Sequence, residues 1–165
     1  MRIHIIGGSG SGKSYVAKKI SKKYHLEIID LDEIEWKDNY TNKTPLETRK
    51  KKLKKRVKKD QIVVEGVYYN WIDESLKVAD YIFFLEVPYS VQKYRILKRS
   101  LFRKLGIYKT DKKESIKSIK ALLKWNKEYN TVLQPEIKKV LEPYKNKVYN
   151  VKRYEEIIEI IGGIK

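Results

Sequence analysis

One stretch near the N-terminus carries the clearest chemical pattern of this chain: residues 7–14 read GGSGSGKS. They match the phosphate-binding pattern G-x-x-x-x-G-K-[ST], the P-loop, at every specified position. Glycines permit a tight loop whose backbone N–H groups surround phosphate oxygens, and the following helix adds its positive end. Lys13 would reach the β- and γ-phosphates, and the Ser14 hydroxyl would bind Mg²⁺. The pattern predicts a site for ATP and Mg²⁺ formed by Gly8, Ser9, Gly10, Ser11, Gly12, Lys13, Ser14 and Tyr15.

Acidic side chains end two of the apolar runs that follow, with Asp30 and Asp32 after one run and Glu65 after another. If the runs are parallel strands, these acids share the edge at which open α/β sheets bind ligands. Carboxylates there can hold Mg²⁺ or accept a proton from a substrate hydroxyl. We predict Asp30 and Glu65 as metal ligands beside Ser14, and Asp32 as a catalytic residue. The alternative for the first two acids is a helix N-cap followed by a solvated side chain.

Arginines are few, seven among 38 basic residues, and three of them lie four residues apart at Arg95, Arg99 and Arg103. On the helix predicted over residues 90–104 this spacing places them in one stripe. Phosphoryl transfer requires cations over the migrating group. We predict Arg99 and Arg103 as catalytic and Arg95 as nucleotide-binding; the alternative is an exposed basic face. The apolar face of the same helix is predicted to be Val91, Tyr94, Leu97, Leu101 and Leu105.

A sheet must position these residues. Five apolar runs predict its strands, at residues 2–6, 26–30, 61–66, 80–88 and 147–151. Segments with helical spacing separate the runs, among them 46–59, 90–104 and 113–133, while the polar residues 37–45 are predicted to form a loop. This alternation predicts a three-layer α/β/α P-loop NTPase fold with a five-stranded parallel sheet. The chain has no repeat and no linker, so we expect residues 1–165 to form a single domain.

Composition limits the class of protein. At 165 residues the chain can bury one core, and the lack of cysteine removes disulfides and thiolate metal sites. No apolar run approaches the length of a transmembrane helix, and the short non-polar stretch at the N-terminus does not form a signal peptide. These features predict a cytoplasmic protein with no membrane partner.

The net charge of +17 exceeds what one nucleotide site requires. Nine of the eleven residues 49–59 are basic, which favours a nucleic-acid partner. The alternatives are a lysine-rich compositional bias and a helix with one thin apolar stripe and a solvated face. The sequence leaves both interpretations open.

Several shorter pieces extend the pattern over almost the whole chain. They are Asp30-Leu31-Asp32 with Trp36, Glu65-Gly66-Val67-Tyr68, Val87-Pro88 and Leu123-Lys124-Trp125. With these pieces and its P-loop, the chain resembles the DNA topology modulation proteins, small P-loop NTPases that are similar to adenylate kinase. The resemblance implies an adenylate-kinase-like core, a phosphate acceptor bound between residues 31 and 60, and a short helical lid within residues 95–113.

The resemblance also implies roles for particular residues. Adenine would lie beside Lys152 and Arg153, and the three spaced arginines would lead into and line the lid. The chain departs from the family where residues 131–135 lack an arginine. It departs again between residues 106 and 113, where the lid is short and also lacks one.

Three functions are compatible with these patterns. The first is a small-molecule kinase that transfers the γ-phosphoryl group of Mg-ATP to a nucleotide or nucleoside, and a sugar acid or shikimate would use the same residues. In such a kinase the aromatic residues 67–71 would stack on a substrate base, although they could equally belong to the core. The second is an ATP-dependent nucleic-acid-binding protein, and the third is an ATPase without an acceptor.

Overall fold

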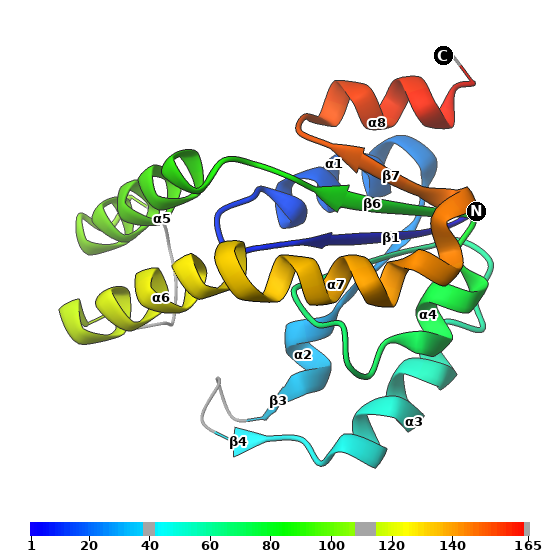
Figure 1. Ribbon diagram of the computed structural model, residues 1–165, viewed down its shortest axis with the longest axis horizontal. Helices are drawn as coiled ribbons and strands as arrows, with labels where there is room; N and C mark the ends of the chain where they lie inside the picture. The colour runs from blue at the N-terminus through cyan, green and yellow to red at the C-terminus, as the bar shows by residue number, and fades with distance from the viewer. Residues whose placement is uncertain (38–41, 108–114, 164–165) are drawn as a thin grey trace.

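The computed structural model describes residues 1–37, 42–107 and 115–163. Five parallel strands form its central sheet in the order β2-β5-β1-β6-β7 (Figure 1). This arrangement confirms the predicted α/β fold with a five-stranded parallel sheet. The strands are β1 (Arg2–Gly7), β2 (Glu27–Asp30), β5 (Ile62–Gly66), β6 (Tyr81–Leu85) and β7 (Val148–Val151).

Helices cover both faces of the sheet because each strand sends apolar side chains alternately to the two sides. In β1, Ile3 and Ile5 enter one core and Ile6 enters the other. The first core is closed by α1 (Lys13–Tyr24) and α8 (Tyr154–Ile161). The second core is closed by α2 (Leu31–Glu35), α3 (Leu46–Arg56), α4 (Asp73–Val78) and α7 (Gln134–Leu141), on the opposite side in Figure 1.

Two helices, α5 (Tyr89–Lys104) and α6 (Ile116–Glu128), extend side by side away from the sheet (Figure 1). Residues 108–114, which include part of the predicted lid, lie outside the described residues. A π-helical turn, Tyr129–Leu133, joins α6 to α7, and a 3₁₀ helix, Glu142–Lys147, leads into β7. No helix in the described part of the chain has the length and apolar character needed to cross a bilayer.

The predicted apolar face of α5 is wrong. All five of its members are exposed in the structure, from 37% for Val91 to 62% for Tyr94 and Leu105. The buried side of α5 consists of Gln92, Ile96 and Ser100 instead. Helical periodicity marks a face but does not say which face the tertiary structure covers. Here the covered face includes Gln92, which packs against the P-loop glycines.

Two further elements differ from the expected pattern. The segment predicted as a loop over residues 37–45 contains paired strands, β3 (Trp36–Lys37) and β4 (Asn42–Lys43), on either side of residues outside the described part. The helix predicted over residues 113–133 ends at Glu128 and continues as the π-helical turn. Within that turn the Asn130 side chain bonds to Gln92 and to the Asn126 carbonyl oxygen, which links the turn to α5.

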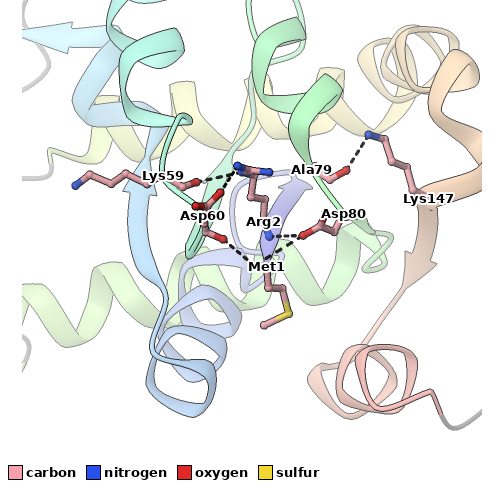
Figure 2. Close-up of polar contacts among 7 residues, drawn as sticks. All are labelled: Met1, Arg2, Lys59, Asp60, Ala79, Asp80 and Lys147. Carbon is pink, nitrogen blue, oxygen red and sulfur yellow. Dashed lines mark hydrogen bonds and ion pairs between the residues drawn. The ribbon is translucent and has the colours of Figure 1, made fainter.

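The amino end of the sheet is tied together by polar contacts (Figure 2). The Arg2 guanidinium pairs with Asp60, which precedes β5, and the Arg2 backbone N–H donates to the Asp80 carboxylate, which precedes β6, at 2.7 Å. Lys147 Nζ, just before β7, donates to the Ala79 carbonyl oxygen at 2.8 Å. These contacts hold the entries of four strands together, so the opposite, carboxyl edge carries the loops that are free to bind ligands.

Candidate active site

The P-loop connects β1 to α1 at the carboxyl edge of the sheet. Gly10 and Gly12 adopt φ angles of 77° and 98°, a region that favours glycine, and the Ser11 N–H closes the loop on the Gly8 carbonyl oxygen at 3.2 Å. The residue that caps α1 is Gly12, which has no side chain to bond to the first-turn N–H groups of the helix. The helix start with its backbone donors is therefore open to an anion, as the sequence pattern predicts.

The N-terminal turns of α5 pack against the P-loop. A Cβ atom placed on Gly10 would lie 2.6 Å from the Gln92 carbonyl oxygen, and one on Gly8 would lie 2.8 Å from the Gln92 side chain and the Tyr129 ring. Arg95 Nη1 donates to the Ser11 carbonyl oxygen at 2.9 Å. Gly8 and Gly10 thus allow α5 to approach the loop closely, and Gly10 also supplies a positive φ of the loop.

A cavity of about 390 Å³ opens beside the loop. It brings together residues that the sequence analysis places at the nucleotide: Tyr15, Arg95, Lys152 and Arg153 line it together with the backbone of the loop. Tyr154 also lines it and was not predicted. The cavity adjoins the P-loop, and its lining combines the cations Arg95, Lys152 and Arg153 with the acid Glu155.

Asp30 and Glu65 lie next to each other, because β2 and β5 pair with these two residues in register. Asp30 Oδ1 accepts the Asp32 N–H at 2.8 Å and so caps α2, as the alternative interpretation of this acid expected. Burial, reinforced by Glu65, raises the pKa of Asp30 to about 6. Glu65 is 4% exposed, and its Oε2 has no hydrogen-bond partner among the described residues.

Two adjacent carboxylates with an unsatisfied buried oxygen are a donor set that fits a divalent cation. The described residues contain no group of three or more acidic, histidine or cysteine side chains arranged for a metal. Mg²⁺ keeps several waters and binds phosphate oxygens, so it needs few protein ligands. The residues present fit Mg²⁺ held together with a nucleotide, with Ser14 exposed in the first turn of α1.

Asp32 lies in the first turn of α2 and has a partner that the sequence did not indicate. The Tyr68 hydroxyl donates to Asp32 Oδ1 at 2.9 Å, and Trp36 Nε1 donates to the Tyr68 oxygen at 3.0 Å. Trp71, the last of the aromatic residues 67–71, is 2% exposed and packs its ring 5.5 Å from that of Tyr68. Tyr69 lies outside this group, since its hydroxyl donates to Glu136 on α7 at 2.7 Å.

A buried ion pair lies at the last residue of α2, the helix that carries Asp32. Glu35, with a side chain only 3% exposed, pairs with Arg49 of α3 and, at 3.5 Å, with Lys43 of β4. The Arg49 guanidinium also lies 5.6 Å from the centre of the Trp71 ring. In the sequence Arg49 is recognisable only as the first member of a basic run, and the one available signal is an arginine at the start of a run composed mainly of lysine.

The arginine stripe of α5 is only partly at the nucleotide site. Arg95 contacts the P-loop, whereas Arg99 and Arg103 lie one and two turns farther along the helix, about 6 and 12 Å along its axis. Both are half-buried and each has interactions within the protein. Their catalytic role stays a prediction.

Comparisons with known sequences leave the family open. The chain matches no known family model. It is 29% identical over 102 residues to the uncharacterized protein YqaC of Bacillus subtilis strain 168, and the match covers 61% of this chain and 57% of YqaC. The chain thus spans little more than half the length of that relative. The resemblance to DNA topology modulation proteins stays a prediction.

Solved structures are similar over nearly the whole chain. A gluconokinase from Sinorhizobium meliloti 1021 superposes with a TM-score of 0.55 at 18% identity and covers 99% of this chain and 90% of its own. A shikimate kinase from Acinetobacter baumannii in complex with shikimate superposes with a TM-score of 0.57 at 19% identity, covering 99% and 94%. The chain therefore has the P-loop NTPase fold on which these kinases are built.

Proposed function

We propose that this protein is a small-molecule kinase that transfers the γ-phosphoryl group of Mg-ATP to a hydroxyl of a nucleotide or nucleoside. One observation carries the proposal: a complete P-loop shares its sheet edge with a half-buried carboxylate, Asp32, that a neighbouring hydroxyl orients. A simple ATP-binding switch has no need of an oriented carboxylate at that place, whereas phosphoryl transfer to an alcohol needs a proton acceptor there.

ATP would bind with its phosphates on the backbone N–H groups of the P-loop. Lys13 would neutralise charge on the β- and γ-phosphates, and the base would occupy the cavity lined by Tyr15, Arg95 and Arg153. Ser14, Asp30 and Glu65 would hold Mg²⁺. Bound there, Mg²⁺ would supply positive charge that offsets the negative charge developing on the transferred phosphoryl group.

The acceptor would lie on the α2 side, between residues 31 and 60. Asp32 would accept the proton of its hydroxyl while the hydroxyl oxygen forms a bond to the γ-phosphorus. The bond from that phosphorus to the β–γ bridging oxygen breaks, and ADP leaves. Arg99 and Arg103 would approach the migrating group from α5, within the predicted lid region of residues 95–113.

The class of acceptor molecule is proposed on different evidence from the type of reaction. A nucleotide or nucleoside is what the resemblance to the adenylate-kinase-like family implies. The similar structures are named for gluconate and shikimate kinases, which supports a sugar acid or shikimate as the next candidates. An ATP-dependent kinase of this kind is expected in the cytoplasm, where ATP is abundant.

The test is ADP release from Mg-ATP in the presence of nucleoside monophosphates, nucleosides, gluconate and shikimate, each supplied separately. The proposal expects one class of acceptor to raise turnover well above the acceptor-free rate, with phosphate recovered on that acceptor. Turnover that no acceptor raises, in a protein that still binds ATP, would contradict it and favour an ATPase.

A second candidate function has its own observation. Helix α3 exposes Lys51, Lys52, Lys54 and Lys55 along one continuous surface, which favours a polyanion such as nucleic acid. Some of the basic run is already neutralised, since Arg56 pairs with Glu33 and Lys59 with Glu27. Binding of a DNA or RNA duplex at two salt concentrations tests this function. A nucleic-acid-binding protein should lose affinity steeply as salt rises, and equal weak binding at both would exclude it.

A further inference from the structure

The Tyr68 hydroxyl connects Asp32 to the indole of Trp36, and the donors and acceptors in this chain are unambiguous. An indole N–H can only donate, so the Tyr68 oxygen accepts from Trp36 Nε1 at 3.0 Å. The single proton of the phenol is then directed to Asp32 Oδ1 at 2.9 Å, because an ionised carboxylate can only accept. The hydrogen bonds therefore run in one direction, from Trp36 through Tyr68 to Asp32.

The consequence for Asp32 is that one carboxylate oxygen is occupied and its rotation is restricted. The backbone N–H of Asp32 is held by Asp30, so the residue is restrained at both its main chain and its side chain. Among the described residues, the second carboxylate oxygen has no hydrogen-bond or ion-pair partner. That oxygen remains for a hydroxyl group of a ligand.

Tyr68 and Trp36 are themselves held in place. The Tyr68 ring packs against buried Trp71, and burial together with neighbouring Asp32 raises the pKa of the phenol, so the hydroxyl stays protonated as a donor. The Lys43 ammonium lies 5.2 Å from the centre of the Trp36 ring, and the same lysine pairs with Glu35. The paired strands β3 and β4 thus hold the indole within hydrogen-bond distance of the phenol.

We propose that Tyr68 is a positioning residue, which orients Asp32 so that its free oxygen faces the acceptor hydroxyl, and that Trp36 keeps Tyr68 in this donor role. The proposal rests on the kinase function proposed above. Tyr68 acts through Asp32 and does not touch the phosphates. Its loss should therefore lower kcat and leave the KM for ATP unchanged.

The test compares three variants by steady-state kinetics with the acceptor that the wild-type protein uses. Tyr68→Phe keeps the ring and removes one hydrogen bond to a charged group, so kcat should fall about tenfold to a hundredfold while the KM for ATP stays within about twofold. Trp36→Phe should give a smaller fall, because the phenol keeps its proton but loses its orientation. Tyr69→Phe removes a hydroxyl of the adjacent residue and should stay within about twofold of the wild type.

A double-mutant cycle between Tyr68→Phe and Asp32→Asn, measured by urea unfolding, tests the contact without an acceptor. The proposal expects the combined shift in urea midpoint to differ from the sum of the single shifts. Additive shifts overturn it, whatever the kinetics. Coupled shifts with an unchanged kcat in Tyr68→Phe also overturn it, since the bond would then be structural only. A wild-type protein that phosphorylates no acceptor refutes the kinase function itself, and with it any positioning role.

Discussion

The two halves of the candidate site are built in different ways. The phosphate-binding loop of the nucleotide half comes from one continuous stretch, residues 7–14, which offers backbone N–H groups and Lys13. The open cavity beside the loop adds Arg95, Lys152 and Arg153 from later in the chain. The acceptor half combines α2, the paired strands β3 and β4, α3 and the end of β5. It offers carboxylates and aromatic rings whose polar groups already bond to one another. A site that binds through its backbone can be recognised in a local pattern, whereas a site that binds through side chains depends on segments distant in sequence.

The largest effect is expected on the nucleotide half. Lys13→Ala removes the cation that would act on the transferred group, so ADP release should fall about a thousandfold, while the fold and Tm stay close to the wild type. ADP release from Mg-ATP measures it. Lys22→Ala, an exposed lysine in the last turn of the same helix, is the control and should change neither rate nor Tm. Equal rates of ADP release in Lys13→Ala and Lys22→Ala would mean that the P-loop takes no part in the reaction.

The acceptor half should respond most strongly to loss of its buried carboxylate. Glu35→Gln leaves Arg49 without its partner in a setting where the arginine side chain is only 15% exposed, and should lower the free energy of unfolding by about 3 kcal/mol. Urea unfolding measures it. Glu47→Gln, which breaks the exposed pair with Lys50, should cost less than about 0.5 kcal/mol. An equal loss of unfolding free energy in Glu35→Gln and Glu47→Gln would mean that the buried pair does not stabilise the acceptor half.

A backbone substitution on the nucleotide half should have an intermediate effect. Gly10→Ala forces alanine into positive φ and brings its Cβ against the Gln92 carbonyl oxygen, so unfolding free energy should fall by about 2 kcal/mol and ATP affinity should weaken. Gly163 has a similar φ of 73°, but no described residue beyond its chain neighbours would come within 4 Å of a Cβ added there. Gly163→Ala therefore measures the backbone strain of positive φ without a steric contact. Thermal unfolding and ATP titration distinguish the two. If Gly10→Ala lowers the unfolding free energy no more than Gly163→Ala does, the loop does not pack tightly against α5.

The smallest effect is expected at the boundary between the halves, where Asp30 caps α2. Its pKa is raised to about 6 by burial and by Glu65, so its carboxylate form is disfavoured in the folded protein. The stabilising contribution of this raised pKa is complete below about pH 4 and is lost as pH rises through 6. Asp30→Asn keeps a good N-cap without the charge, so it should unfold at higher urea than the wild type at pH 7 and at similar urea near pH 4.

The same variant should weaken Mg²⁺-dependent turnover, because the carboxylate would no longer hold the ion. Urea midpoints from pH 4 to 8 measure the first effect and Mg²⁺ titration of ADP release the second. Parallel pH curves for wild type and Asp30→Asn would contradict the first expectation. If Asp30→Asn needs the same Mg²⁺ concentration as the wild type, residues other than Asp30 hold the metal ion.

Part of the fold was predictable because strands buried on both faces are apolar throughout. Runs such as 61–66 and 80–88 have few alternatives to a central parallel strand. Helix α5 was predicted in extent but not in orientation. Its apolar residues Tyr94, Leu97 and Leu101 are exposed, while Gln92 is buried through bonds to the Val87 carbonyl oxygen and to Asn130. A buried glutamine is stable only with such partners, and periodicity contains no information about them.

The sequence by itself determined the phosphate-binding loop, the parallel sheet and the edge at which Asp30, Asp32 and Glu65 gather. Glycine conformation, strand burial and parallel pairing are local or repetitive properties that a linear pattern can carry. Only the tertiary structure decided that Asp30 caps a helix, that Tyr68 and Trp36 direct a proton to Asp32, and that Arg49 is bound to Glu35. The contacts of Asp32 and Arg49 depend on which side chains meet across 14 to 36 residues of sequence, and hydrogen-bond directions follow only once they have met. The Asp30 cap spans only two residues, but an acid at that place is compatible with a cap or a metal ligand until the structure is known.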